Sequence, residues 1–188
     1  MKLSISVMAH PSREKYFDYL KRKLGNPKFS VDKGWGLWEN CKRSWQLYNP
    51  KLEYHLVVQD DAIICDDFIK KAEEVIIKAK GKAISFYYGY RGNLIREAAK
   101  GMRDGFLIGP VRWGIAICLP TVLIKSMIQE CSRMTIKQDD TRIKQYLKNH
   151  KIRTYFPIPS LIDHRAENSL VGDPGKGRKA FYFIGNGN

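Results

Sequence analysis

The chain of 188 residues is 44% hydrophobic and 28% charged, which is typical of a folded globular protein and excludes a chain that is disordered throughout. Its length suffices for one substantial core and is too short for two comfortable domains. The formal net charge of +14 favours a polyanionic partner, whether nucleic acid, an acidic glycan or an anionic membrane surface.

The cysteines and the apolar runs argue against a zinc protein and against a membrane protein. The four cysteines are widely spaced and form no CxxC pair, so we expect buried thiols in a reducing compartment. The N-terminal segment alternates like a strand and lacks the long apolar core of a signal peptide. No run approaches the roughly 18 apolar residues that a membrane span needs. We therefore expect a soluble, cytoplasmic protein.

In the first half of the chain, strands alternate with helices. Ser12 is expected to cap the first helix, which Gly25 ends, and Asp66 or Asp67 caps the third. The tryptophans at 35, 38 and 45 are expected in the core. The expected strands lie over 3–7, 29–31, 54–59 and 83–88, and the expected helices over 16–24, 37–45 and 68–79. This alternation predicts a mostly parallel α/β sheet flanked by helices.

The second half begins with a stretch of a different kind. Residues 89–110 are rich in glycine and arginine with weak periodicity, which predicts a flexible or partly helical excursion. Further on, strands are expected over 113–119, 155–157 and 161–162, all in the sheet, with helices over 121–131 and from Asp139 onward. Residues 172–179 read as a basic loop. No internal repeat or interdomain linker is evident, so we expect a single domain.

The most informative segment is Tyr54–Ala62, an apolar run that ends in two adjacent carboxylates. Residues 56–58 predict a strand buried on both faces, which places Asp60 and Asp61 at its carboxyl end, where open α/β sheets bind ligands. Neighbouring like charges are costly unless a positive charge lies beside them, and Mg²⁺ or Mn²⁺ carrying a diphosphate would supply it. The competing interpretation is an ordinary solvated turn.

Four segments, taken together, carry a family resemblance. They are Gln59-Asp60-Asp61, Trp113-Gly114-Ile115-Ala116, Gln138-Asp139-Asp140-Thr141-Arg142-Ile143 and Pro159-Ser160-Leu161-Ile162-Asp163-His164. In this order and spacing the chain resembles metal-dependent nucleotide-sugar glycosyltransferases of the GT-A fold, and it is similar to short transferases encoded by bacterial viruses. Gln59 stands where many members carry an acidic residue, so Asp61 is a stronger candidate metal ligand than Asp60.

The resemblance implies a GT-A-like, Rossmann-related fold that binds a UDP-sugar with Mn²⁺ or Mg²⁺. Residues 1–88 would form the nucleotide-sugar-binding half, and residues 89–188 the acceptor-binding half with a basic tail. Asp61 and His164 are the implied metal ligands, and Asp60 would contact ribose or a metal-bound water. The metal would stabilise the charge that builds on the departing diphosphate.

The nucleotide pocket is implied to include the loop after the first strand. Its backbone amides and an arginine could meet phosphate, and Asp32 after the second strand could accept hydrogen bonds from uracil or ribose. The loop residues are His10, Pro11, Ser12 and Arg13. The competing interpretation is helix capping by Ser12 and a turn at Asp32.

The general base is expected in the later acidic motif. Asp139 or Asp140 could take the proton from the acceptor hydroxyl, and the resemblance points to Asp140 in an inverting reaction. The competing interpretation is that both residues only cap the helix and complement its dipole.

Aromatic and cationic residues predict the acceptor side. The candidates are Tyr90, Arg91, Arg112, Trp113 and Gly114. With the positive net charge, they favour a hydroxymethylated pyrimidine in DNA as the acceptor. One alternative is that the acceptor is a lipopolysaccharide, a capsule or a protein glycan, and residues 181–184 would then be a hint of a membrane-docking segment. Another alternative is that the protein binds nucleic acid without catalysing a reaction.

Overall fold

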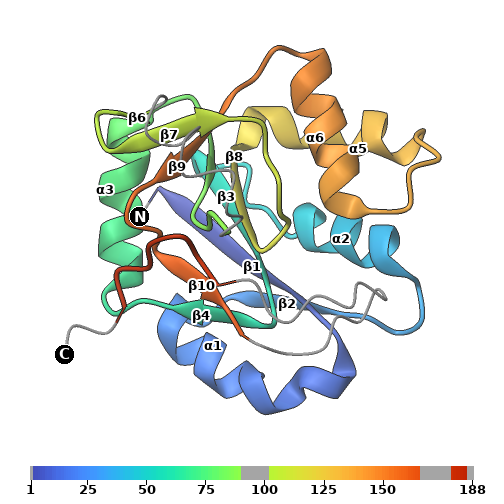
Figure 1. The fold of residues 1–188 in the computed structure, drawn as a ribbon. Coiled ribbons are helices and arrows are strands. Elements are labelled where there is room, and N and C mark those ends of the chain that lie inside the picture. The colour runs from blue at the N-terminus through green and yellow to red at the C-terminus, as the bar shows by residue number, and fades with distance from the viewer. Residues whose placement is uncertain (1, 90–101, 166–178, 186–188) are drawn as a thin grey trace.

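The computed structural model describes residues 2–89, 102–165 and 179–185 (Figure 1). Its helices are the 3-10 helix η1 (Pro11–Tyr16) and the α-helices α1 (Phe17–Leu24), α2 (Leu37–Gln46), α3 (Phe68–Lys78), α5 (Thr121–Ser132) and α6 (Asp139–Asn149). The main sheet contains β1 (Leu3–Ala9), β2 (Lys28–Val31), β3 (Tyr54–Gln59), β5 (Ala83–Ser85), β6 (Met102–Arg103), β7 (Phe106–Gly109), β8 (Ala116–Pro120) and β9 (Thr154–Pro157). A second sheet pairs β4 (Ala62–Ile64) with β10 (Ile162–His164).

Within the described residues, the main sheet has eight strands in the order β2-β1-β3-β8-β5-β9-β7-β6. Parallel pairing joins β2 to β1, β1 to β3 and β5 to β9. Strand β8 is antiparallel to both β3 and β5, and β7 is antiparallel to both β9 and β6. Only β7 and β8 therefore run against the common direction, which confirms the predicted mostly parallel sheet.

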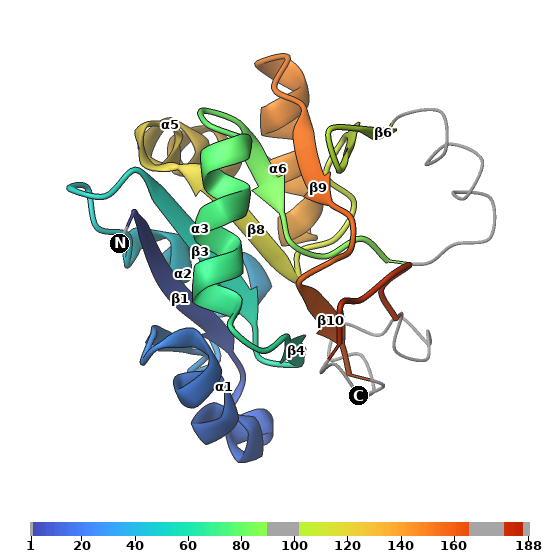
Figure 2. The ribbon, with the colours of Figure 1, turned by 90° about the vertical axis from the view of Figure 1, so that its left-hand side faces the viewer.

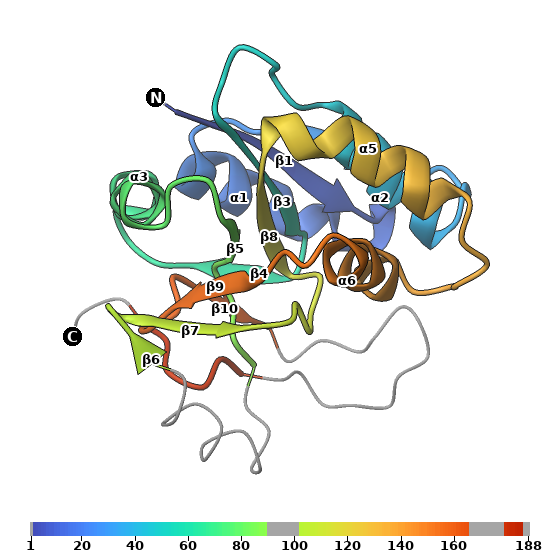
Figure 3. The same ribbon diagram turned by 90° about the horizontal axis from the view of Figure 1, so that it is seen from above.

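Helices cover both faces of this sheet, so the fold has three layers (Figure 3). Leu20 and Leu24 of α1 pack with Phe68 of α3 in one apolar cluster. On the other face, Trp45 of α2 packs with Met127 of α5 and residues of α6 in a second cluster. The apolar run at residues 56–58 is almost fully buried between these layers, as its composition predicts.

The main-sheet register aligns the carboxyl ends of three parallel strands. Met8 of β1 pairs with Gln59 of β3, and Ala9 pairs with Val31 of β2. The residues that follow these strands, among them His10, Asp32 and Asp60, therefore leave the sheet along one edge. This is the edge at which open α/β sheets bind their ligands.

Several expected elements differ from the structure. Strand β5 stops at Ser85 instead of residue 88, and β8 begins at Ala116 instead of residue 113. The expected excursion over 89–110 contains the β6–β7 hairpin, whose turn uses positive φ angles at Asp104 and Gly105. Residues 90–101 lie outside the described part of the chain, as do residues 166–178 with most of the expected basic loop.

The expected strand over 161–162 does not join the main sheet. It forms β10, which pairs antiparallel with β4, and this two-stranded sheet lies just beyond the end of β3, where the chain runs into β4 (Figure 2). Strand β4 was not anticipated, because three residues after an acidic turn carry too short a pattern. Near the C-terminus, Phe181 and Phe183 pack against the core, while Tyr182 is 58% exposed.

Candidate active site

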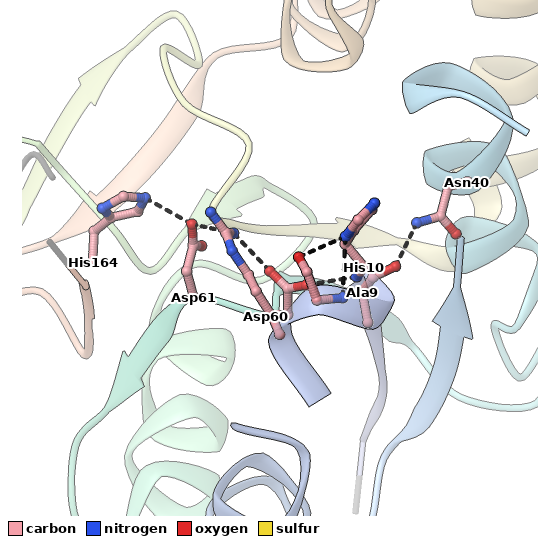
Figure 4. Close-up of polar contacts among 8 residues, drawn as sticks. Ala9, His10, Asn40, Asp60, Asp61 and His164 are labelled. Atoms are coloured by element: carbon pink, nitrogen blue, oxygen red, sulfur yellow. Dashed lines mark hydrogen bonds and ion pairs between the residues drawn. The ribbon is translucent and has the colours of Figure 1, made fainter. Parts of the chain in front are cut away.

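Two adjacent carboxylates at the end of β3 form the centre of the site. Asp60 and Asp61 are 3% and 4% exposed, so the interpretation of this segment as an ordinary solvated turn is wrong. Buried carboxylates need compensating charge and hydrogen bonds. Arg13 provides both: its Nη1 lies 2.8 Å from Asp60 Oδ1 and 2.6 Å from Asp61 Oδ2. The second oxygen of Asp60 accepts a hydrogen bond from the His10 backbone N–H at 2.6 Å (Figure 4).

The β4–β10 sheet brings His164 to Asp61 from more than 100 residues away in sequence. His164 pairs with Ala62 across this sheet, and the backbone N–H of Arg165 donates to the carbonyl of Asp61 at 2.9 Å. As a result, His164 Nε2 lies 3.2 Å from Asp61 Oδ2 (Figure 4). The predicted convergence of these two residues is therefore present in the structure.

The two carboxyl groups have opposite electrostatic environments. Burial is the largest influence on Asp60 and raises its pKa above the usual value, although Arg13 and the His10 amide oppose it. Burial also acts to raise the pKa of Asp61, but the hydrogen bond and charge of His164, together with Arg13, outweigh it and lower that pKa. Asp61 is thus the more firmly ionised of the two.

Asp61 and His164 are the predicted ligands of a divalent cation, and two of their atoms lack partners. Asp61 Oδ1 and His164 Nδ1 are buried and have no hydrogen-bond partner among the described residues. No set of three or more His, Cys, Asp or Glu side chains in the described ranges is arranged to hold a metal ion. Mg²⁺ is commonly held by one or two carboxylates together with substrate phosphates. The His164 ring turns Nε2 toward Asp61 and Nδ1 away from it (Figure 4), so a cation shared by the two residues would contact His164 Nε2 and an Asp61 carboxylate oxygen and would complete its coordination with a diphosphate.

The later acidic motif meets the end of β3 at Gly114. Strand β8 starts beside the end of β3, where the Gln59 N–H donates to the Ile115 carbonyl at 2.9 Å. A Cβ atom placed on Gly114 would lie 3.0 Å from Gln59 Nε2, 3.5 Å from Asp140 Cβ and 3.6 Å from Asp139 Oδ2. The absence of a side chain at Gly114 therefore lets side chains from both acidic motifs approach the backbone closely.

Asp139 and Asp140 differ in exposure. Asp139 is 6% exposed, and burial followed by the charge of Asp140 raises its pKa to about 6. Its carboxylate accepts a hydrogen bond from the Cys41 thiol, whose own pKa burial raises well above normal. Asp140 is half-buried, and its Oδ1 accepts a hydrogen bond from Thr141. The N-cap residue of α6 is Gln138, whose side chain makes no capping hydrogen bond, whereas backbone N–H groups of Asp139 and Asp140 at the helix start act to lower the pKa of Asp139, as the capping interpretation expects.

The predicted nucleotide-side residues have mainly local partners. His10, not Ser12, occupies the N-cap of η1: His10 Nδ1 accepts from the Ser12 backbone N–H, and the Ser12 hydroxyl lies 2.8 Å away. Pro11 is exposed at the first position of this helix. Asp32 Oδ1 accepts from the backbone N–H groups of Gly34 and Trp35, as the turn interpretation expects.

The predicted acceptor side is described only in part. Tyr90 and Arg91 lie outside the described residues. Arg112 is exposed, whereas the Trp113 ring is 7% exposed and packs edge-on against Tyr87 and Tyr88, with centroids 5.6 and 5.5 Å away. Trp113 therefore supports this wall of the site from inside the core.

Arg165 is not among the predicted site residues, and Trp35 differs from its prediction. The Arg165 guanidinium lies over the rings of Tyr16 and Tyr19, 4.3 and 4.8 Å from their centroids, and its Nε is buried without a hydrogen-bond partner among the described residues. Trp35, expected in the core, is 37% exposed because it lies in the turn before α2, with Arg43 stacked on its ring at 4.0 Å. No sequence pattern marks either contact.

The comparisons with known proteins identify the fold and not a family. No protein-family model and no curated protein matches the chain. The fold is similar to that of A197 from STIV, with a TM-score of 0.53, 13% identity and coverage of 100% of this chain and 96% of that chain. It is also similar to S. aureus TarS 1-349 in complex with UDP-GlcNAc, with a TM-score of 0.53 and 14% identity, covering 100% of this chain and 59% of that chain. These likenesses confirm the GT-A-like fold.

A separate check concerns membrane spans. Among the described residues, no helix is both long and apolar enough to cross a membrane.

Proposed function

We propose that the chain is a glycosyltransferase that transfers a sugar from a UDP-sugar to a hydroxyl group. The observation that carries this proposal is the convergence of Asp61 and His164 beside Arg13, at the edge of the sheet where β1 and β3 end. The fold it shares with TarS, which was solved with UDP-GlcNAc, supports the choice of donor.

In this proposal, Asp61 and His164 hold Mn²⁺ or Mg²⁺, and Asp60 contacts ribose or a metal-bound water. When bound, the ion stabilises negative charge on the departing diphosphate. The loop from His10 to Arg13 and the turn at Asp32 lie at the ends of β1 and β2, where they line the nucleotide side.

Asp140 acts as the general base in this proposal and gives an inverting reaction. It is less buried than Asp139 and its Cβ lies near Gly114, which supports it as the carboxylate that an acceptor hydroxyl reaches. Asp139, which Cys41 holds, positions the start of α6.

The test is transfer or hydrolysis of a set of UDP-sugars with Mn²⁺. We expect UDP release by the wild-type protein, and a loss of about 100-fold or more in Asp61→Asn and Asp140→Asn. Lys80→Gln, an exposed change between α3 and β5, is the control and should leave the rate unchanged. No UDP release with any donor would contradict the proposal.

For the acceptor, we propose a hydroxymethylated pyrimidine in DNA. The net charge of +14 and the exposed Arg112, two residues before Gly114, support a phosphate-rich acceptor. DNA containing hydroxymethyluracil or hydroxymethylcytosine should gain mass in the presence of a UDP-sugar and Mn²⁺, whereas unmodified DNA should not. Transfer to a glycan or a lipid-linked acceptor only would replace this acceptor while leaving the transferase proposal in place.

A further inference from the structure

Arg13 occupies the place where a counter-ion to the carboxylate pair is needed. Its side chain is 10% exposed, and one nitrogen, Nη1, contacts both Asp60 Oδ1 and Asp61 Oδ2. A buried guanidinium in this position compensates much of the charge of the two carboxylates without any ligand.

The same contact conflicts with cation binding. Asp61 Oδ2 already has Arg13 Nη1 at 2.6 Å and His164 Nε2 at 3.2 Å, so both neighbours of this oxygen are nitrogens. A divalent cation held by Asp61 and His164 would lie next to the guanidinium, and like charges at such distances in a buried site repel strongly. The cation and the present position of Arg13 are therefore mutually unfavourable.

The backbone at Arg13 differs from that of its helix neighbours. Its φ and ψ angles of −111° and 16° are not helical and interrupt η1, and its N–H donates to the His10 carbonyl at 3.0 Å. Because the helix is already interrupted here, the side chain can be redirected without unwinding a continuous helical turn. Arg13 also follows the loop at the end of β1, on the side proposed for the nucleotide.

We propose that Arg13 competes with the divalent cation for Asp61, and that cation binding transfers the guanidinium from the carboxylates to the donor diphosphate. This inference rests on the proposed function. A guanidinium displaced from carboxylates finds another anionic partner in a phosphate, which it can bind through two nitrogens. The cation and the nucleotide then strengthen each other's binding. The diphosphate takes up the Arg13 guanidinium that the cation displaces, and the cation takes up the Asp61 carboxylate that the guanidinium leaves. This coupling is reciprocal.

The first arm of the test measures Mn²⁺ binding without nucleotide, by electron paramagnetic resonance of free Mn²⁺. Removing the competing charge in Arg13→Gln should tighten Mn²⁺ binding by about tenfold, within the usual range of coupling between sites. Arg22→Gln, which removes the same charge from an exposed position on α1, should bind Mn²⁺ as the wild type does. Asp61→Asn should lose the site in either background.

The second arm repeats the titration with UDP. UDP supplies phosphate ligands to Mn²⁺ in both proteins, but its enhancement of Mn²⁺ binding should be about tenfold greater in the wild type than in Arg13→Gln, because that variant has no guanidinium to transfer. Equal Mn²⁺ affinity of the wild type and Arg13→Gln without UDP overturns the competition. Equal enhancement by UDP in both proteins overturns the transfer of Arg13 to the diphosphate.

The competition between Arg13 and the cation can still be tested if Arg13→Gln does not fold. Arg13→Met also removes the charge and keeps a long unbranched side chain in the buried position, so it should bind Mn²⁺ about tenfold more tightly than the wild type. If Arg13→Gln does not fold, an unchanged affinity in Arg13→Met overturns the proposal. Failure of the wild type to bind UDP at any Mn²⁺ concentration contradicts the proposed function instead, while the Mn²⁺-only comparison still decides the competition.

Discussion

Among single residues, Asp139 combines deep burial with a neighbouring like charge. Burial, and then the charge of Asp140, raise its pKa from 3.8 to about 6. The folded protein therefore keeps this proton to a higher pH than the unfolded chain does. Stability consequently falls as the pH rises from about 4 to about 6, since the folded state must ionise a buried group. Such a cost is typical of groups that a site retains for function.

Asp139→Asn should remove this cost. We expect its free energy of unfolding to exceed that of the wild type by about 2 to 3 kcal/mol near pH 8, with no gain near pH 4. Urea unfolding at the two pH values measures the difference. Asp140→Asn is the matched control, and because Asp140 is less buried its gain should be smaller. A gain that does not depend on pH would contradict this explanation.

Gly114 gives a second prediction for a single residue. A Cβ at this position would contact Gln59 Nε2 at 3.0 Å and would lie close to side chains of both acidic motifs. Because Gln59 can move its flexible end, we expect Gly114→Ala to change the free energy of unfolding by less than about 1 kcal/mol.

Its effect on turnover should be larger. Displacement of catalytic groups by about 1 Å can reduce rates by about 100-fold, so kcat should fall by roughly 10- to 100-fold. Gly109→Ala is the control, since a Cβ there meets nothing within 4 Å. Normal turnover in Gly114→Ala would show that catalysis does not depend on the close approach at Gly114.

Between elements, a buried histidine joins β3, β1 and α2. His55 of β3 is fully buried; its ring nitrogens lie 2.9 Å from the Ser4 hydroxyl and 3.1 Å from the Ser6 hydroxyl, and Nε2 is 3.2 Å from the Ser44 carbonyl. Burial lowers its pKa from 6.5 to about 4. The imidazole is therefore neutral in the folded protein across the pH range in which the unfolded chain takes up a proton.

This histidine should make stability depend on pH. Its contribution is complete above pH 6.5, and up to about 3 kcal/mol is lost as the pH falls from 6.5 to about 4. The contribution of Asp139 to stability changes with pH in the opposite direction over part of this range. The free energy of unfolding is therefore best measured in an Asp139→Asn background. His55→Gln should flatten the pH dependence there, whereas His150→Gln, at an exposed site, should preserve it. An unchanged slope in His55→Gln would contradict the assignment.

Across the whole molecule, the excess positive charge predicts binding to polyanions. If DNA is the acceptor, its affinity should fall by about tenfold or more between about 50 and about 200 mM salt, because bound phosphates release counterions. Filter binding with unmodified duplex DNA at several salt concentrations measures this dependence. Asp61→Asn should bind DNA normally while losing transfer, which separates docking from chemistry. Affinity that is independent of salt would argue against a phosphate-rich acceptor.

Local patterns in the sequence account for much of the fold. The run at 56–58 predicts a doubly buried strand, and the glycine after Leu24 adopts the left-handed conformation that ends α1. They also locate both acidic motifs, because Asp60 and Asp139 stand at the ends of recognisable elements. These features depend on neighbours in sequence and are visible without a structure.

What the sequence does not reveal depends on contacts between distant residues. Arg13 is separated from Asp60 and Asp61 by 47 and 48 residues, so no periodicity indicates that one guanidinium bridges both. The pairing of β4 with β10 is equally remote, and each strand has only three residues. The exposure of Trp35 is set by the turn at Asp32, which overrides its apolar character.

The late position of β10 has a consequence for synthesis on the ribosome. A nascent chain that has emerged as far as β3 already contains β1, Arg13 and both aspartates, whereas the imidazole of His164 is made about 100 residues later. During that interval, the charge of the guanidinium is available to the carboxylates before the imidazole is. The proposed metal ligand His164 is thus added only after most of the scaffold has been translated.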